Sequence, residues 1–254
     1  MGQTKPRETS RIKGDDMKYH IDTIPVWDAI KKDCECLLCS IEEIQEEKSI
    51  GFYLGDSVMQ PDIRQQTNRT GFCINHYSMM YSKAKKLPMG LAAHSRLEYI
   101  NENLHKYYDR IKNEDKTFKK SGAVECCDFI EEITAECTVC NSIDENMKRY
   151  FFTFIHLWKN ESEFREMFLK SKGLCLKHFK ELIQFAQKES SDKIALDMVK
   201  GLAEVQNKNL QRLAEEVKYF NDKFDHRNVD KPWGTAKDAL PRAINKLTGG
   251  KIKT

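Results

Sequence analysis

The sequence predicts an all-α protein made of two tandem helical repeats, each stapled by a Cys3His metal site, followed by a C-terminal extension. Three observations lead to this prediction. Apolar residues recur at helical spacing over long stretches, no clear run of alternating β-branched residues is present, and one Cys/His pattern occurs twice at a nearly constant offset.

The repeated pattern is a C-x-x-C pair followed, after a long spacer, by Gly, an apolar residue, Cys, two further residues and His. The first copy reads CLLC and GFCINH, and the second reads CTVC and GLCLKH. Cys36 lies 101 residues before Cys137, and Cys73 lies 102 residues before Cys175. Four matched positions with a single one-residue insertion indicate an internal duplication of about 100 residues.

Amphipathic stripes predict the helices of both halves. Steps of three and four residues place apolar side chains on one face of a helix. In chain order, the stripes are Leu97, Ile100, Leu104, Tyr107 and Ile111; Ile143, Met147, Tyr150, Phe154 and Leu157; and Leu210, Leu213, Val217, Phe220 and Phe224. Ile41 and Ile44 begin a counterpart helix after the first C-x-x-C.

The domain organisation follows from these stripes and from changes in composition. We expect residues 1–16 to be a disordered lead and residues 17–112 to form the first metal-binding repeat. A polar, Gly-ended linker spans 113–122 and precedes the second repeat over 123–224. Residues 225–254 carry prolines and a short helix around Ala239–Leu247, and we expect them to wrap across the helical body and end in a basic tail.

Composition restricts the class of protein. A net charge of +3 favours neither nucleic acid nor a membrane surface, no apolar run of 18 residues could cross a bilayer, and the N-terminus has no secretory signal. Nine cysteines are an odd number and too few for a disulfide scaffold. Patterned cysteines of this kind predict a cytoplasmic protein that binds metal or performs redox chemistry.

Three thiols and one imidazole per repeat suit a tetrahedral zinc ion, so we expect two Zn²⁺ per chain. The predicted ligands are Cys36, Cys39, Cys73 and His76 for one ion, and Cys137, Cys140, Cys175 and His178 for the other. Each ion would then close a loop of about 40 residues within its own repeat. An iron–sulfur cluster is the alternative, although sets of four cysteines are more usual for clusters.

Several residues outside this pattern remain candidates for a role. Cys34 could replace Cys36 as a ligand, and the adjacent Cys126 and Cys127 could be reactive thiols or small packing residues. Asp56 and Arg64 could face a groove between the repeats, or form an ion pair in a solvated loop.

The chain also resembles a family of uncharacterised proteins. The stretches that carry the resemblance are YHIDTIPVWDAI, CLLC, LGDSVMQPDIR, NRTGFCINH, FREMFLKSKGLCLKHF and FDHRNVDKPWGTAKDALPRAINKLTG. They are similar to a family from anaerobic Gram-positive bacteria that carries the duplicated Cys-rich module over about residues 17–250. The resemblance implies a bacterial cytoplasmic setting but no reaction and no substrate. Leu37 or Leu38 stands where the family pattern has Pro, which leaves the ligands intact.

Three hypotheses for function follow. The first is a non-enzymatic, zinc-stapled protein that binds an unknown protein or small molecule in a groove between the repeats, since closed four-ligand sites do not catalyse. The second is thiol redox or metal handling. The third, nucleic-acid binding, is disfavoured by the near-neutral charge and by a spacer between the ligand pairs much longer than that of a zinc finger. No recognised catalytic motif occurs, and the sequence does not indicate an oligomeric state.

Overall fold

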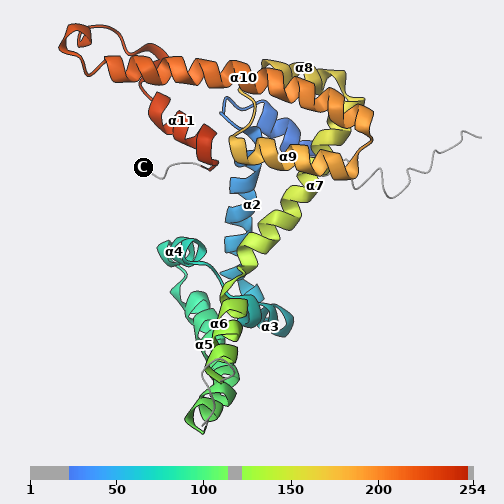
Figure 1. Ribbon diagram of the computed structural model, residues 1–254, viewed down its shortest axis with the longest axis vertical. Helices are drawn as coiled ribbons and strands as arrows, with labels where there is room; N and C mark the ends of the chain where they lie inside the picture. The colour runs from blue at the N-terminus through green and yellow to red at the C-terminus, as the bar shows by residue number, and fades with distance from the viewer. Residues whose placement is uncertain (1–22, 114–121, 251–254) are drawn as a thin grey trace, which may run out of the picture. The chain divides into compact units, whose positions relative to one another are not determined.

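The computed structural model describes residues 23–113 and 122–250, and these residues are helical almost throughout (Figure 1). No strand occurs in the described part of the chain, which confirms the all-α prediction. The predicted lead over 1–16, most of the linker over 113–122 and the tail over 251–254 lie outside the described residues. None of the described helices is both long enough and apolar enough to cross a membrane.

The first half begins with a helix over residues 23–30 and continues through α2 (Leu37–Tyr53) and a short 3-10 turn, η1 (Asp56–Met59). It then forms α3 (Pro61–Thr70), α4 (Ile74–Ser82) and the long α5 (Lys86–Lys112). Pro61 occupies the start of α3, where its missing N–H costs no hydrogen bond.

The second half, over its described residues, repeats this order of α-helices, without a counterpart of η1. It comprises α6 (Gly122–Thr134), α7 (Thr138–Asn160), α8 (Ser162–Lys170), α9 (Leu176–Glu189) and the long α10 (Asp192–Asp222). The extension that follows contains η3 (His226–Asn228), η4 (Gly234–Ala236) and α11 (Ala239–Thr248). The short helix predicted around Ala239–Leu247 is therefore confirmed.

The chain forms two compact units that do not coincide with the sequence repeats. Unit 1 combines Met1–Ile41 with Lys148–Thr254, and unit 2 is Glu42–Met147. The boundaries fall inside α2 and α7, so the first turns of α2 belong to unit 1 and the first turns of α7 belong to unit 2. Unit 1 is consequently discontinuous in the chain, whereas unit 2 is one continuous segment.

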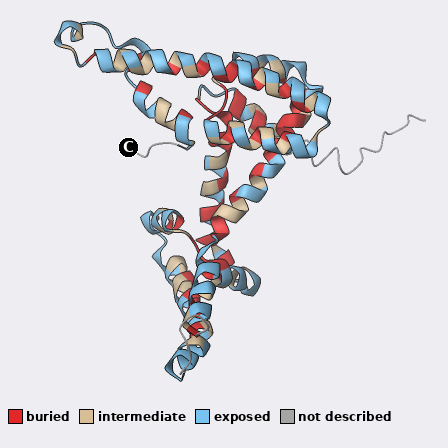
Figure 2. Cartoon of the chain, in the orientation of Figure 1, coloured by how far each residue is buried: buried red, intermediate tan, exposed pale blue. Residues whose placement is uncertain are grey.

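The core of unit 1 is aromatic. Phe154 of α7 packs edge-to-face against Phe164 and Phe168 of α8, with ring centroids 5.0 and 5.2 Å apart, and all three side chains are almost fully buried. The indole of Trp158 donates a hydrogen bond to Asp197 of α10 at 2.9 Å. The apolar stripe predicted for α7 is buried at every position, as expected for a helix enclosed by neighbours (Figure 2).

Unit 2 is built on α5, which packs against α3, α4 and α6. Its stripe is only partly enclosed, since Leu104 is 9 % exposed but Leu97 is 67 % exposed. A smaller aromatic group, in which Phe72 contacts Tyr53 and Tyr77, lies close to the second ligand pair of this half. This aromatic group and the start of α7 lie next to the candidate metal centre of unit 2.

Candidate metal centres

The eight predicted ligands gather into two groups, one in each unit. In each group three sulfurs and one imidazole nitrogen lie within 4.8 Å of one another. The Cys36 site, in unit 1, contains Cys36, Cys39, Cys175 and His178. The Cys73 site, in unit 2, contains Cys73, His76, Cys137 and Cys140.

The predicted pairing of the ligands was therefore wrong. Each C-x-x-C pair meets the C-x-x-H pair of the other half, so the ligands are exchanged between the sequence repeats. The 40-residue loops predicted from the sequence are replaced by separations of 136 residues between Cys39 and Cys175, and 61 residues between His76 and Cys137. A second contact shows the same exchange, because the backbone N–H of Thr138 donates to the carbonyl of Gly71 at 2.9 Å.

Local geometry at each C-x-x-H pair follows the prediction. Cys73 and Cys175 are the N-cap residues of α4 and α9, and each His lies three positions later, one turn along the helix. Gly71 and Gly173 precede them with φ of 67° and 75°, a left-handed conformation that glycine adopts without steric cost. The chain can therefore turn sharply just before each of these helices begins.

The C-x-x-C pairs stand at the starts of the other two helices. Cys36 and Cys137 each precede the first residue of a helix, α2 and α7 respectively, and the second Cys of each pair lies in its first turn. The backbone N–H of Cys39 donates to Cys36 Sγ at 3.4 Å, and that of His178 donates to Cys175 Sγ at 3.4 Å. Such N–H groups, together with the positive ends of the helix dipoles, stabilise thiolates.

The distances between donor atoms match those around a single tetrahedral ion. With Zn–S near 2.3 Å and Zn–N near 2.0 Å, a tetrahedron separates sulfur from nitrogen by about 3.5 Å and sulfur from sulfur by about 3.8 Å. In the Cys36 site, His178 Nδ1 lies 3.3–3.5 Å from the three sulfurs, and Cys39 Sγ lies 3.5 Å from Cys175 Sγ. In the Cys73 site, His76 Nδ1 lies 3.2–3.4 Å from its three sulfurs.

The close packing of the donors changes the pKa values at the Cys73 site. Burial disfavours the charged imidazole, but the hydrogen bond with the Cys137 thiolate outweighs it and raises the pKa of His76 to about 9. Burial also opposes ionisation of Cys137, yet His76 and neighbouring backbone N–H groups lower its pKa to about 6. Burial and the adjacent Cys137 thiolate raise the pKa of Cys140 to about 12. A metal ion entering this site must displace protons.

The same pattern holds at the Cys36 site. Hydrogen bonds from Cys36 and Cys39 hold the pKa of Cys175 well below its usual range. Burial, together with hydrogen bonds with Cys175 and Cys39, raises the pKa of Cys36 well above its usual value. Burial lowers the pKa of His178, but its bonds to Cys175 and Cys39 prevail and raise it to about 10.

Residues outside the ligand pattern complete each site, and the sequence analysis missed them. At the Cys73 site, His76 Nε2 lies 3.1 Å from Glu46 Oε1, a carboxylate that fixes the orientation of the ring so that Nδ1 faces the sulfurs. Glu46 follows Cys39 by seven residues, two turns along α2, but nothing in the sequence pairs it with a histidine of another helix.

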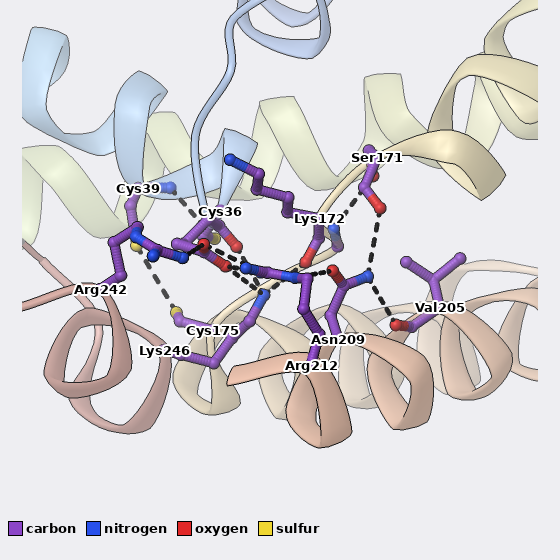
Figure 3. Close-up of polar contacts among 12 residues, drawn as sticks. Cys36, Cys39, Ser171, Lys172, Cys175, Val205, Asn209, Arg212, Arg242 and Lys246 are labelled. Carbon is purple, nitrogen blue, oxygen red and sulfur yellow. Dashed lines mark hydrogen bonds and ion pairs between the residues drawn. The ribbon is translucent and has the colours of Figure 1, made fainter. Parts of the chain in front are cut away.

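At the Cys36 site, the missed residues form a charged layer around Glu35, which is buried next to Cys36. The Glu35 carboxylate accepts hydrogen bonds from Arg212 at 2.7 Å and from Arg242 at 3.2 Å. The Lys246 ammonium donates to the Glu35 carbonyl at 2.7 Å (Figure 3). These cations lie 177–211 residues from Glu35 along the chain, and no sequence pattern links residues so far apart.

The other candidates stay outside both groups. Cys34 is half-buried and is not one of the four donors, so Cys36 holds the ligand position. In α6, Cys126 is buried and Cys127 is exposed, because consecutive helical side chains point about 100° apart. Asp56 is an exposed residue of η1 and Arg64 a half-buried residue of α3. Their reactive or ligand-binding roles stay predictions.

Comparison with known sequences places the chain in a family. The model of DUF6062, a family of unknown function, matches residues 17–254. The chain belongs to this family. No curated protein and no solved structure matches the chain.

Proposed function

We propose that this DUF6062 protein binds two zinc ions and that the ions hold its helices together. The observation that carries the proposal is the convergence of three thiols and one Nδ1 to within 4.8 Å, twice, at helix starts. Donors that surround one point suit a mononuclear ion, whereas an iron–sulfur cluster spaces its ligands around two or more irons. Three cysteines and one histidine are a usual structural zinc set.

The ions would act as structural staples, because four protein donors fill a tetrahedral shell and leave no position for substrate. We infer a non-enzymatic role from this closed coordination. The predicted partner, a protein or small molecule bound in a groove between the repeats, stays part of the proposal. All nine cysteines are free thiols, which supports a reducing compartment such as the bacterial cytoplasm.

Elemental analysis of purified protein tests the proposal. Two zinc ions per chain are expected, and replacement by Co²⁺ should give the visible absorption and the intense thiolate-to-metal bands of tetrahedral cobalt. Iron with inorganic sulfide would contradict the zinc assignment, and one ion or none would contradict the two-site proposal.

A second candidate function is metal handling at the Cys73 site. The observation that favours it is partial exposure, since Cys73 and Cys140 are half-buried whereas all four ligands of the Cys36 site are buried. A chromogenic zinc chelator should then remove the first equivalent of metal from the Cys73 site. If native mass spectrometry and cysteine alkylation showed both ions leaving together and slowly, the handling role would fail and the structural role would stand.

A further inference from the structure

Lys246 of α11 bridges the two segments that carry the ligands of the Cys36 site. Its side chain is 1 % exposed, and its ammonium donates to the carbonyls of Glu35, at 2.7 Å, and of Lys172. Glu35 immediately precedes Cys36, and Lys172 immediately precedes the Gly173 turn that leads to Cys175. One side chain from the C-terminal extension thus links the supports of both ligand pairs (Figure 3).

At the Cys73 site an arginine of unit 2 makes the corresponding bridge. Arg96 of α5 donates to the carbonyl of Arg69, two residues before Gly71, and to that of Ile133, four residues before Cys137, each at 2.6 Å. Its guanidinium is buried, so both carbonyl groups are satisfied by a side chain of the same compact unit.

In unit 1 the residue of α10 that makes a similar contact is an asparagine, Asn209. Its amide donates at 3.2 Å to the carbonyl of Ser171, which lies two residues before Gly173, as Arg69 lies two residues before Gly71. The shorter asparagine side chain bonds to this segment and to its own helix through Val205, but not to the segment that carries Cys36. Lys246, from outside the repeat, is the side chain that bonds directly to the backbone of both segments.

The end of the extension also touches the thiols themselves. The backbone N–H of Gly250 donates to Cys39 Sγ at 3.4 Å. A Cβ atom on Gly249 would stand 3.4 Å from Cys175 Sγ, so the backbone passes close beside this sulfur as well. The extension therefore contacts one thiol from each ligand pair.

Ion pairs connect the extension to the rest of unit 1. Arg242 of α11 pairs with Glu216 of α10 at 2.6 Å and with Glu35 at 3.2 Å, while Arg212 of α10 approaches the same Glu35 at 2.7 Å. Removing one partner from such a buried group leaves an uncompensated charge, which is strongly destabilising. Docking of α11 and the position of the Glu35–Cys36 segment therefore depend on each other.

Charge also relates α11 to a bound metal. A divalent ion with three thiolates and a neutral imidazole carries a net charge of −1, and the buried ammonium of Lys246 offsets it. Metal at the Cys36 site would accordingly favour the docked position of α11.

We propose that α11 with Gly249 and Gly250 is a metal-linked latch: docking of this segment retains the metal of the Cys36 site, and the metal retains the segment. The inference rests on the proposed function, because it requires a metal ion at that site. Coupling of this kind is reciprocal: the factor by which docking of the segment raises the metal affinity is also the factor by which bound metal strengthens docking.

The test compares Lys246→Met with Lys237→Met in the full-length, zinc-loaded protein. The first change removes the ammonium but keeps a long side chain, and the second alters an exposed lysine of the same extension. Each protein is treated with a zinc chelator and N-ethylmaleimide, and alkylation is followed peptide by peptide. In Lys246→Met, Cys36, Cys39 and Cys175 should react about 10–100-fold faster than in the wild type. The three cysteines of the Cys73 site, and all six in Lys237→Met, should keep wild-type rates.

Hydrogen exchange provides the reciprocal readout. In the wild type, amides of Ala239–Thr248 should exchange about 5–150-fold faster after metal removal, the range typical of coupled sites. In Lys246→Met they should exchange fast in the loaded protein already. If that variant does not fold, a chain ending at Thr248, which lacks the Gly250 N–H donor but keeps Lys246, should accelerate alkylation of the same three cysteines to a smaller extent.

The outcomes separate the latch from the proposed function. Two bound ions with wild-type alkylation of Cys36, Cys39 and Cys175 in Lys246→Met would overturn the latch and leave the zinc proposal standing. Equal acceleration at both sites would show general destabilisation and would also overturn the latch. Protein that binds no metal would overturn both.

Discussion

The Cys36 and Cys73 sites share one ligand set but differ in their surroundings. The Cys36 site has all four ligands buried, with a layer of charged residues and the C-terminal segment packed against it. The Cys73 site has two half-buried thiols, and a carboxylate, Glu46, behind its imidazole. The two sites therefore share their donors and helix starts, whereas the residues around the donors differ.

The sites also differ in what they join. The Cys36 site links α2 to α9 and so ties together the two chain segments of the discontinuous unit 1. The Cys73 site links α4 to α7 within a single continuous segment. Its ligand pairs are about half as far apart in sequence, and each doubling of a closed loop adds about 0.6 kcal/mol of constraint. Loss of the Cys36 site should therefore be the more damaging.

The largest expected effect comes from removing one ligand. Cys175→Ser should lower the free energy of unfolding of unit 1 by about 4 kcal/mol or more, since metal binding energy is also folding energy and the altered group is fully buried. Cys73→Ser should cost less, because water can reach that half-buried position and replace the thiolate. Denaturant titration followed by circular dichroism and by metal content measures both.

Cys126→Ser is the matched control for these variants. Cys126 is a buried cysteine of α6 that belongs to neither site, so we expect a loss of about 1 kcal/mol, the usual effect of a single substitution. Equal, small losses for the three variants would refute structural metal sites. A larger loss for Cys73→Ser than for Cys175→Ser would reverse the proposed ranking of the two sites.

A smaller effect is expected from Glu46→Gln. The amide keeps the shape of the side chain but removes the negative charge opposite His76 Nε2, and loss of such a partner weakens metal binding about 10–100-fold. Affinity measured with a competing chelator should fall at the Cys73 site and stay constant at the Cys36 site. Glu47→Gln, which alters an exposed carboxylate paired with Lys83, should change neither. Unchanged affinity in Glu46→Gln would show that the carboxylate has no role at the metal.

The zinc affinity of the Cys73 site should depend on pH. It should change about tenfold per pH unit for each proton that zinc binding releases. His76 with a pKa of about 9 and Cys140 with a pKa of about 12 hold protons at pH 7, so metal binding at the Cys73 site displaces both. At pH values below these raised pKa values, protons compete with the metal for the donor atoms. The metal affinity should therefore rise as the pH increases from about 6 to 9. Above about 9 the His76 proton no longer has to be displaced, and the slope should decrease.

Calorimetry in buffers of different ionisation enthalpy counts the protons released. A release of at least two protons at pH 7 is expected for this site. Zinc affinity independent of pH between 6 and 9 would contradict the assignment of His76 and Cys140 as protonated ligands that the metal deprotonates.

Much of the fold could be predicted from the sequence because it depends on local periodicity. The stripe from Ile143 to Leu157 predicts α7, and the glycines before Cys73 and Cys175 predict helix starts. The eight donors followed from their repetition. Their pairing did not, because two identical ligand sets are equally compatible with closure within a repeat or across repeats. Lys246 and Arg212 lack any sequence signal, since packing alone brings them to Glu35 over 177–211 residues.

Exchange of ligands between the repeats is the central claim, and cadmium NMR tests it most directly. With ¹¹³Cd in place of zinc, each metal signal correlates with the β-protons of the cysteines bound to it. One signal should correlate with Cys36, Cys39 and Cys175, and the other with Cys73, Cys137 and Cys140. Correlation of one ion with Cys36, Cys39 and Cys73 would show closure within a repeat and would contradict the exchanged arrangement.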